Sequence, residues 1–314
     1  MSNWKGLLRS LLLAATLVVP CGAEAQLFRA YLASDGLDTN PCTLPQPCRL
    51  LPAALAAVAN GGEIWMLDSA NYNASSVNIA KSVTILAVPG VVGSVVAISG
   101  PALNINTGGV SVSLTNLVIL PFDGTGAQGI LMNQGASLAM DGCTISRFLN
   151  DVAVQISTPA KVKVTNSLFR DDYTSLYVEA GSQVDISTSR FFLPPNGYGI
   201  YAKGSDPGPT LVAVTDTVLT GGYNGIAGWD TSATSKVRVT VTRTTLSNSS
   251  FGATASSTVG GSTVLAIGGS MVTGNEVGLN QQGAGSVMES LGNNLVRHNT
   301  NNNTQGTITP IPGT

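Results

Sequence analysis

Charged side chains and histidine are scarce in this sequence of 314 residues. Asp, Glu, Lys and Arg together make up 10% of the chain, the net charge is −2, and His298 is the single histidine. Binding of nucleic acid needs a basic patch and docking on anionic lipid needs a polybasic face, so we expect neither partner. A zinc-type centre needs four ligands, mostly Cys and His, which this composition does not supply. We therefore predict no metal site and no cofactor.

Cysteine is also rare, with four in the chain. Cys42 and Cys48 lie in a proline-rich loop, residues 34–49, and in an exported chain such a pair is most simply a disulfide that fixes the shape of the loop. Metal binding is the alternative, and it would require further ligands from distant parts of the sequence. Cys143 is expected to be a free thiol, because the repeat in which it stands places small residues at that position.

The N-terminus carries an apolar run that is too short to cross a bilayer. A positively charged start, an apolar core over residues 11–19 and a small-x-small site over residues 23–25 indicate a secretory signal peptide, residues 1–25. A buried helix is the alternative, and Pro20 argues against a lipoprotein anchor at Cys21. We expect an exported chain, periplasmic or extracellular, that is free of the membrane once the signal is removed.

A repeat runs from residue 83 to residue 299. Each copy has an apolar-x-apolar strand, a small or polar residue and a closing apolar residue, at a spacing of roughly 22 to 28 residues: 114–119, 140–145, 164–169, 186–191, 214–219, 241–246 and 267–272. A second block begins with Gly or another small residue and continues apolar-x-apolar: 129–132, 153–156, 175–178, 199–202, 225–228 and 252–255. Periods of this length are typical of repeat architectures.

The two blocks predict strands and leave no room for a helix between them. Their alternation has the strand period of two, which excludes leucine-rich and helical solenoids. Coils of this length, stacked about 4.8 Å apart, pair each strand in parallel with its equivalent in the next coil. The sequence therefore predicts an all-β fold, a right-handed parallel β-helix of about ten coils.

The segments outside the repeat complete the predicted organisation. Residues 26–62 would hold an initial strand, the disulfide loop and a short helix over residues 50–58, in which Pro52 is tolerated in the first turn. Such a helix would cap the open end of the stack. Residues 63–299 would form the β-helix, and residues 300–314 a C-terminal tail.

Alignment of the repeats predicts which side chains are neighbours. Large apolar residues should stack as an internal ladder: Ile119, Ile145, Phe169, Phe191, Leu219, Leu246 and Val272. On the outside, Lys163 should lie beside Asp185 and Glu179 beside Lys203, as opposite charges on adjacent coils.

The chain resembles a known group of proteins. Residues 42–54, followed by Gly61-Gly62-Glu63-Ile64 and the repeats, are similar to exported bacterial right-handed parallel β-helix proteins of the pectin-lyase-like superfamily. The resemblance covers essentially the whole chain after residue 25 and implies the fold. It does not select a function, because this superfamily includes lyases, hydrolases, epimerases, phage tailspikes and adhesive surface proteins.

Catalytic motifs of that superfamily are mostly missing. A polygalacturonase-like hydrolase would show Asn-Thr-Asp, Asp-Asp, Gly-His-Gly and Arg-x-Lys on consecutive coils, and Asp171-Asp172 is the single match. A pectate-lyase-like site would need carboxylates on neighbouring coils to hold Ca²⁺, with an arginine as base. Arg170, Asp171 and Asp172 are thus the candidate catalytic residues, and a solvated turn with a local ion pair is the alternative interpretation.

Tyrosines are concentrated in the middle of the repeat. The outward position of the second block reads Leu131, Gln155, Tyr177, Tyr201 and Ala227 in successive coils, which stacks Tyr177 on Tyr201. Four further aromatic residues lie nearby in sequence: Tyr173, Tyr198, Tyr223 and Trp229. Such a face suits sugar C–H surfaces or an apolar partner, whereas packing under turns or in the core is the alternative.

Two functions remain open at this point. One is a non-catalytic exported protein that binds glycan or a surface partner through its side wall, with Tyr177, Tyr201, Tyr198, Tyr223 and Trp229 as binding residues. The other is a polysaccharide lyase or glycoside hydrolase with an unrecognised site. The lack of converging carboxylates and histidine favours the first.

Overall fold

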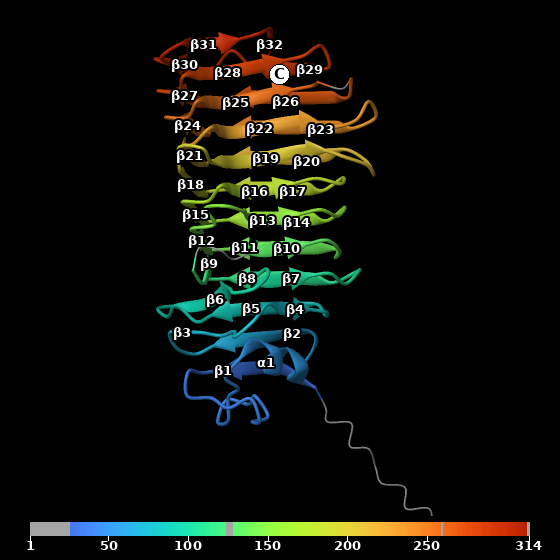
Figure 1. Ribbon diagram of the computed structural model, residues 1–314, viewed down its shortest axis with the longest axis vertical. Helices are drawn as coiled ribbons and strands as arrows, with labels where there is room; N and C mark the ends of the chain where they lie inside the picture. Colours follow the sequence, from blue (N-terminus) through green and yellow to red (C-terminus); the bar gives the residue numbers. More distant parts are fainter. Residues whose placement is uncertain (1–25, 124–127, 259, 313–314) are drawn as a thin grey trace, which may run out of the picture.

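The computed structural model describes residues 26–123, 128–258 and 260–312. They form an all-β parallel solenoid of about nine turns with one short helix near the N-terminus, where about ten turns were predicted (Figure 1). The predicted signal peptide, residues 1–25, lies outside the described residues. None of the described helices is long and apolar enough to cross a membrane.

Three sheets run along the stack, and every strand pairs in parallel with the equivalent strand of the next coil. The first sheet has twelve strands: β1 (Leu27–Leu32), β2 (Val58–Met66), β5 (Val83–Ala87), β8 (Ser111–Thr115), β11 (Ser137–Asp141), β14 (Lys161–Thr165), β17 (Gln183–Ser187), β20 (Thr210–Thr215), β23 (Lys236–Thr242), β26 (Ser262–Gly268), β29 (Ser286–Ser290) and β32 (Ile308–Pro310).

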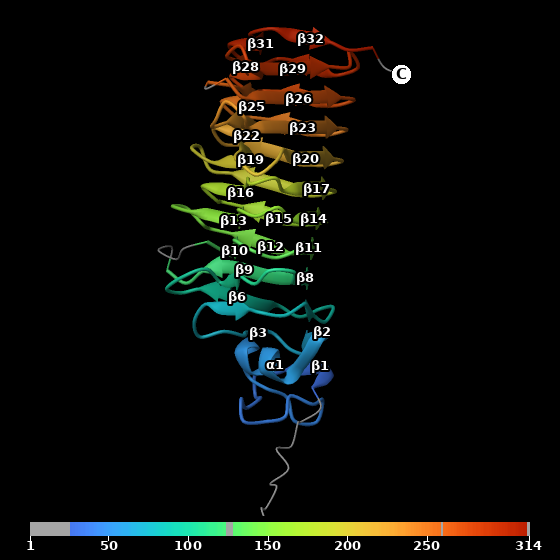
Figure 2. The ribbon, with the colours of Figure 1, turned by 90° about the vertical axis from the view of Figure 1, so that its right-hand side faces the viewer.

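The second sheet has ten strands: β4 (Val77–Ile79), β7 (Leu103–Ile105), β10 (Ile130–Met132), β13 (Val152–Ile156), β16 (Thr174–Val178), β19 (Tyr198–Gly204), β22 (Asn224–Asp230), β25 (Phe251–Ser256), β28 (Val277–Gln282) and β31 (Asn302–Gln305). The third sheet also has ten: β3 (Ala70–Asn71), β6 (Gly93–Ala97), β9 (Leu117–Pro121), β12 (Thr144–Ser146), β15 (Leu168–Arg170), β18 (Arg190–Leu193), β21 (Val218–Gly221), β24 (Thr245–Ser247), β27 (Met271–Thr273) and β30 (Leu295–Arg297). Figure 2 shows the coils stacked along the long axis of the molecule.

The predicted internal ladder is confirmed. Its seven residues pair in register from coil to coil, from Ile119 against Ile145 to Leu246 against Val272, and all are fully buried. The rings of Phe169 and Phe191 stack with centroids 4.6 Å apart. Because the ladder passes through seven successive coils, the core runs through the stack and is not confined to one end. Burial of each large apolar side chain stabilises the fold by about 1.5–3 kcal/mol.

A tight turn joins the first sheet to the third in each repeat. The turn residue has a positive φ in seven successive coils: Asn116, Gly142, Asn166, Thr188, Asp216, Arg243 and Gly269. The next residue is small and buried, and from Ser167 onward its hydroxyl often accepts a hydrogen bond from the backbone N–H of the coil before, as Ser167 does from Cys143 at 3.2 Å. Cys143 is a buried free thiol in this column, as predicted.

The N-terminal end is covered by the helix and the disulfide loop. Helix α1 (Leu51–Ala57) has Pro52 in its first turn and buries Leu51, Ala54 and Leu55. The predicted disulfide is confirmed, with the Cα atoms of Cys42 and Cys48 4.6 Å apart. The first coil begins earlier than expected, because the chain turns from α1 directly into β2 at Val58 without the predicted break at residues 60–62.

The expected C-terminal tail, residues 300–314, is a wrong prediction for most of its length. Strands β31 and β32 lie in it and pair with β28 and β29, so the stack extends to Pro310. Strand β31 reads Asn-Asn-Thr-Gln and lacks apolar alternation. Most of its side chains are exposed, so apolar residues are not needed there.

Candidate functional site: an aromatic wall and a neighbouring groove

The tyrosines predicted to stack on the outside do so. Tyr177 of β16 pairs with Tyr201 of β19, and their rings are nearly parallel with centroids 5.6 Å apart. The column is in the predicted register, with Gln155 before Tyr177 and Ala227 after Tyr201. Both tyrosines are half-buried, so part of each ring is accessible to a ligand.

A second row of rings runs beside this pair. Tyr173, Tyr198, Tyr223 and Phe251 lie on four successive coils, and each ring meets the next edge to face at centroid distances of 6.2, 5.6 and 5.4 Å. Tyr198 also meets Tyr201 at 5.5 Å, which joins the two rows. We call the six residues, Tyr173, Tyr177, Tyr198, Tyr201, Tyr223 and Phe251, the aromatic wall.

Close backbone contact places the two rows side by side. At the small residue of the second block, a Cβ on Gly199 would lie 2.4 Å from the Gly225 carbonyl oxygen and one on Gly225 would lie 2.6 Å from the Gly252 carbonyl oxygen. Glycine is therefore required at these positions for the coils to stack. Tyr198 immediately precedes Gly199, and Tyr201 follows it by two residues.

The most exposed rings of the second row are its first and third members, Tyr173 and Tyr223. Tyr173 is 44% exposed and Tyr223 is 41% exposed, which is high for aromatic side chains that already contact other rings. Large exposed apolar surfaces of this kind mark binding sites more often than isolated exposed residues do.

Polar groups surround the Tyr177–Tyr201 pair. Tyr177 Oη donates to Glu179 Oε2 at 3.1 Å, and Lys203 Nζ lies 3.1 Å from the same oxygen, which confirms the predicted contact of Glu179 with Lys203. Lys203 Nζ also lies 5.8 Å from the centre of the Tyr177 ring. Partial burial raises the pKa of Tyr177 and that of Tyr198, and raises the pKa of Tyr201 to about 12. These hydroxyls are therefore neutral hydrogen-bond donors at physiological pH.

Sequence reasoning placed Trp229 in this site and missed Phe251. Trp229 lies in register with Lys203 and forms none of the ring contacts found among the described residues. Phe251 is the last member of the second row. The signal that could have found it is its place directly before Gly252, which repeats the place of Tyr198 before Gly199.

The candidate catalytic residues do not converge. Arg170 Nε forms an ion pair with Asp171 Oδ2 at 3.2 Å, and both side chains are about half exposed. Asp172 is fully buried, where it accepts a hydrogen bond from the backbone N–H of Phe148 at 3.1 Å and a longer one from the Ser175 hydroxyl at 3.4 Å. The alternative interpretation, a solvated turn, is thus right for Arg170 and Asp171 and wrong for Asp172. Across the described residues, no three His, Cys, Asp or Glu side chains gather closely enough to hold a metal ion.

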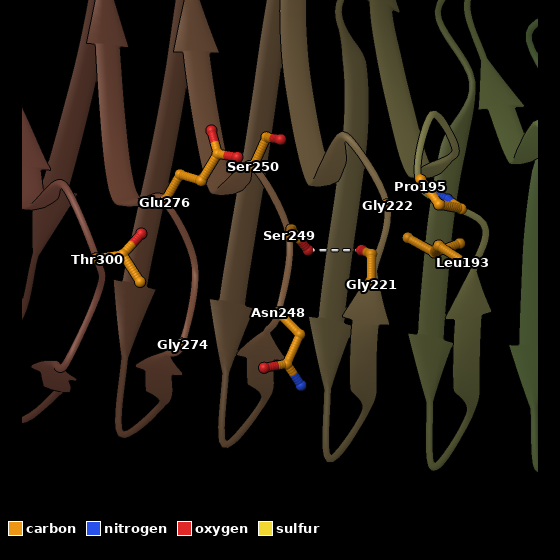
Figure 3. Close-up of a pocket in the computed structure, with 10 residues that line it drawn as sticks. All are labelled: Leu193, Pro195, Gly221, Gly222, Asn248, Ser249, Ser250, Gly274, Glu276 and Thr300. Carbon is orange, nitrogen blue, oxygen red and sulfur yellow. Dashed lines mark hydrogen bonds between the residues drawn. The ribbon is translucent and has the colours of Figure 1, made fainter.

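A groove of about 430 Å³ lies on the outside of the stack (Figure 3). We call it the turn groove, because the turns that follow successive strands of the third sheet line it: Leu193, Pro195, Gly221, Gly222, Asn248, Ser249, Ser250, Gly274, Glu276 and Thr300. Its floor is fixed by backbone contacts, such as the hydrogen bond of the Ser249 hydroxyl to the Gly221 carbonyl oxygen at 2.6 Å. Tyr223 directly follows Gly222 in the sequence, and Phe251 directly follows Ser250, but neither aromatic residue is part of the lining.

Comparison with known proteins identifies the fold. No protein-family model and no curated protein matches the sequence. Among solved structures, pectate lyase Pel9A matches with a TM-score of 0.56 and 13% identity, over 85% of this chain and 75% of that one. A structure of XylC in complex with xylose matches with a TM-score of 0.52 and 8% identity, over 81% of this chain and 69% of that one. The chain therefore has a parallel β-helix fold similar to that of pectate lyase Pel9A.

Proposed function

We propose that this chain is an exported, non-catalytic protein that binds a polysaccharide, free or on a cell surface, through the aromatic wall. The observation that carries the proposal is the unbroken contact of six aromatic rings on the outside of the stack. Aromatic rings stack on the C–H faces of sugars, and tyrosine hydroxyls add hydrogen bonds to sugar hydroxyls. A solenoid offers such a surface along its length without distorting its core.

The polar groups beside the rings support the same ligand class. Glu179 and Lys203 hold each other and Tyr177 in place, so the stacked pair is fixed before a ligand arrives. A site ordered in advance loses less conformational entropy on binding. Because the fold neighbour XylC was solved with xylose, xylose polymers are a reasonable first probe.

The arrangement of Arg170, Asp171 and Asp172 supports binding without cleavage. Asp171 is paired with Arg170, and Asp172 is fully buried, away from any ligand on the surface. A catalytic carboxylate must instead reach the bond that it acts on. We expect no depolymerisation by this protein.

A glycan-array screen, run beside a reducing-end assay on acidic and neutral polysaccharides, tests the proposed function. The expected result is binding to at least one polysaccharide with no new reducing ends. Release of reducing ends that is lost in the Asp171→Asn variant would overturn the proposal in favour of a polysaccharide lyase or hydrolase. Failure to bind any glycan would also overturn it.

Export of the chain is part of the proposal. The Cys42–Cys48 disulfide supports it, because disulfides persist in oxidising compartments such as the periplasm and the extracellular space. Mass spectrometry of protein recovered from cell fractions checks this. We expect a chain that begins near Gln26, carries the disulfide and is absent from the cytoplasm.

A further inference from the structure

The outer face of the third sheet carries a column of side chains that alternates between apolar and polar residues up to Met271. The column pairs in register through eight coils, and we call it the third-sheet stripe: Val118, Thr144, Leu168, Arg190, Val218, Thr245, Met271 and Leu295. Seven of these residues directly precede a residue of the internal ladder. Because successive side chains of a strand point to opposite faces, the stripe points away from the core.

The apolar members of the stripe are partly or largely exposed. Val218 is 38% exposed, Met271 is 39% exposed and Leu295 is 54% exposed, while Val118 and Leu168 are partly exposed. A paired outer column of the first sheet is instead made of small and polar residues: Ala139, Lys163, Asp185, Ala213 and Thr240. Exposed apolar side chains that gather on one face mark a contact surface more often than scattered ones do.

The spacing of the apolar members favours a particular partner. Adjacent coils are about 4.8 Å apart, so the apolar residues from Val118 to Met271 recur about every 9.6 Å. Seven residues of an α-helix rise about 10.5 Å, so a helix laid along the stripe would be out of step by about 3 Å after three intervals. A second copy of this chain has the same interval throughout. Its third sheet is also straight, since β12 to β30 follow the long axis without a bend (Figures 1 and 2).

A two-fold axis at Val218 makes the stripe complementary to itself. If this axis is parallel to the strands, the second stack runs antiparallel to the first, and coils at equal distances from Val218 face one another. Leu168, two coils before Val218, then faces Met271, two coils after it. Arg190 faces Thr245, so the charged residue of the stripe meets a neutral hydroxyl. Such a pairing of one surface with itself is the usual interface of a symmetric dimer.

The face has about the size that a specific interface needs. From Val118 to Leu295 the stripe takes seven steps, or about 34 Å. Each third-sheet strand with its flanking turn residues spans about six residues, or about 20 Å. Contact over this face would bury roughly 700 Å² of each copy, close to the about 800 Å² per partner of a standard interface.

We propose that two copies of this chain associate side by side and antiparallel through the third-sheet stripe, with Val218 at the two-fold axis. The inference goes beyond the proposed function and does not depend on it, because Tyr177 and Tyr201 lie on the second sheet, outside this interface. The pair would carry two aromatic walls. Two linked sites hold a repeating polymer more tightly than one site does, because the second binding event occurs at a high effective concentration.

Sedimentation equilibrium of the exported chain tests the association. We expect twice the mass of one chain at about 100 μM protein. Val218→Glu/Met271→Glu should weaken association by about 100-fold or more, because it places charges against an apolar partner. Ala213→Glu/Ala266→Glu is the matched control and should stay paired, since Ala213 and Ala266 lie on an outer column of the first sheet with the same two-coil spacing.

Three results of this experiment would overturn the proposal. They are a parent protein that sediments as one chain at every concentration, a Val218→Glu/Met271→Glu protein that stays paired, and equal dissociation of both charged variants. Thermal unfolding should show that both variants keep the melting temperature of the parent within a few degrees.

Cross-linking tests the direction of pairing without a charged variant. Leu168→Cys and Met271→Cys proteins, mixed and treated with a bismaleimide of about 10 Å reach, should give a mixed product, since packed sheets lie about 10 Å apart. Each variant alone should give none, because its equivalent residues would be four coils, or about 19 Å, apart. Cys143 is buried and does not compete for the reagent.

A product from Leu168→Cys alone, without the mixed product, would contradict the antiparallel arrangement. Absence of every product would contradict the interface itself. Neither experiment measures glycan binding, so a failed glycan screen would remove the proposed function and leave the dimer as it was measured.

Discussion

The carboxyl group of Asp172 is buried inside a bend of the chain, and this has a consequence for stability. Burial raises the pKa of Asp172 well above 3.8, although the hydrogen bond from the Phe148 N–H opposes the shift. The native state therefore binds the proton more tightly than the unfolded state does. The contribution of Asp172 to stability is greatest below pH 3.8 and falls as the pH rises from there toward the native-state pKa.

Asp172→Asn should remove this dependence, because an amide oxygen can still accept the Phe148 hydrogen bond without becoming charged. We expect the free energy of unfolding of the parent, relative to this variant, to decrease as the pH is raised from 4 to 8. Urea denaturation at several pH values measures it. Asp171→Asn is the control and should give no such trend, and an equal trend in both variants would contradict the assignment to Asp172.

Cys143 should be chemically inert in the folded protein. It is 1% exposed, and burial raises the pKa of its thiol to about 11, so neither access nor a thiolate is available for reaction near neutral pH. Mass spectrometry after treatment with iodoacetamide should show no modification in native buffer and one modified thiol in denaturant. Rapid labelling of the native protein would contradict this prediction, because it would show that the turn around Cys143 opens to solvent.

Among the turn residues, burial of Cys143 was predicted from the sequence and burial of Asp172 was not. The repeats identified Cys143 as a buried small residue because six equivalent positions could be compared with it. Asp172 has no acidic equivalents, and a charged residue in a turn is usually solvated. Burial of the Asp172 side chain depends on the direction that the bend at residues 171–173 gives it. Strand periodicity does not specify that direction.

At the scale of the strands, the stacked ladder should carry much of the stability. Phe169→Ala removes a fully buried ring that stacks on Phe191 and is expected to cost about 3–5 kcal/mol. Phe192→Ala is the control, because Phe192 is next to Phe191 but is 41% exposed. It should change stability by about 0.5 kcal/mol or less. Denaturant unfolding of both variants compares them, and similar losses would contradict the predicted register.

The strands were predictable where apolar residues alternate and less so where they do not. The ladder and the paired tyrosines followed from aligned repeats, because one register buries all the apolar side chains on the same face. Strand β31 was missed because its polar side chains carry no such signal, and its strand conformation comes from backbone pairing with β28. The start of β2 at Val58 was missed for a related reason, since the glycines at 61 and 62 resemble a helix end.

At the scale of the whole molecule, the fold was predictable and the surface was predictable in part. The similarity to pectate lyase Pel9A identifies the fold of this chain but assigns no activity to it. Stacking of Tyr177 on Tyr201 followed from the repeats, whereas the second row and the turn groove depend on loops whose lengths differ from coil to coil. Gly221, Gly222 and Gly274 carry no side chains into the groove, and its lining comes together only because five coils are stacked.

Binding of a polysaccharide before and after removal of the stacked tyrosines tests the central claim most directly. Tyr177→Ser/Tyr201→Ser should weaken binding by at least about tenfold, because it removes both stacked rings and the contact to Tyr198. The fold should lose only about 1 kcal/mol through the missing cross-strand pair. Leu131→Ser is the matched control, since Leu131 occupies the same outward column two coils before Tyr177.

Titration calorimetry with the polymer that binds most tightly in the screen is the measurement. The account predicts strong binding by the parent and by Leu131→Ser, and weak or no binding by the folded double variant. Equal affinity in the parent and the double variant would contradict the claim that the aromatic wall is the binding surface.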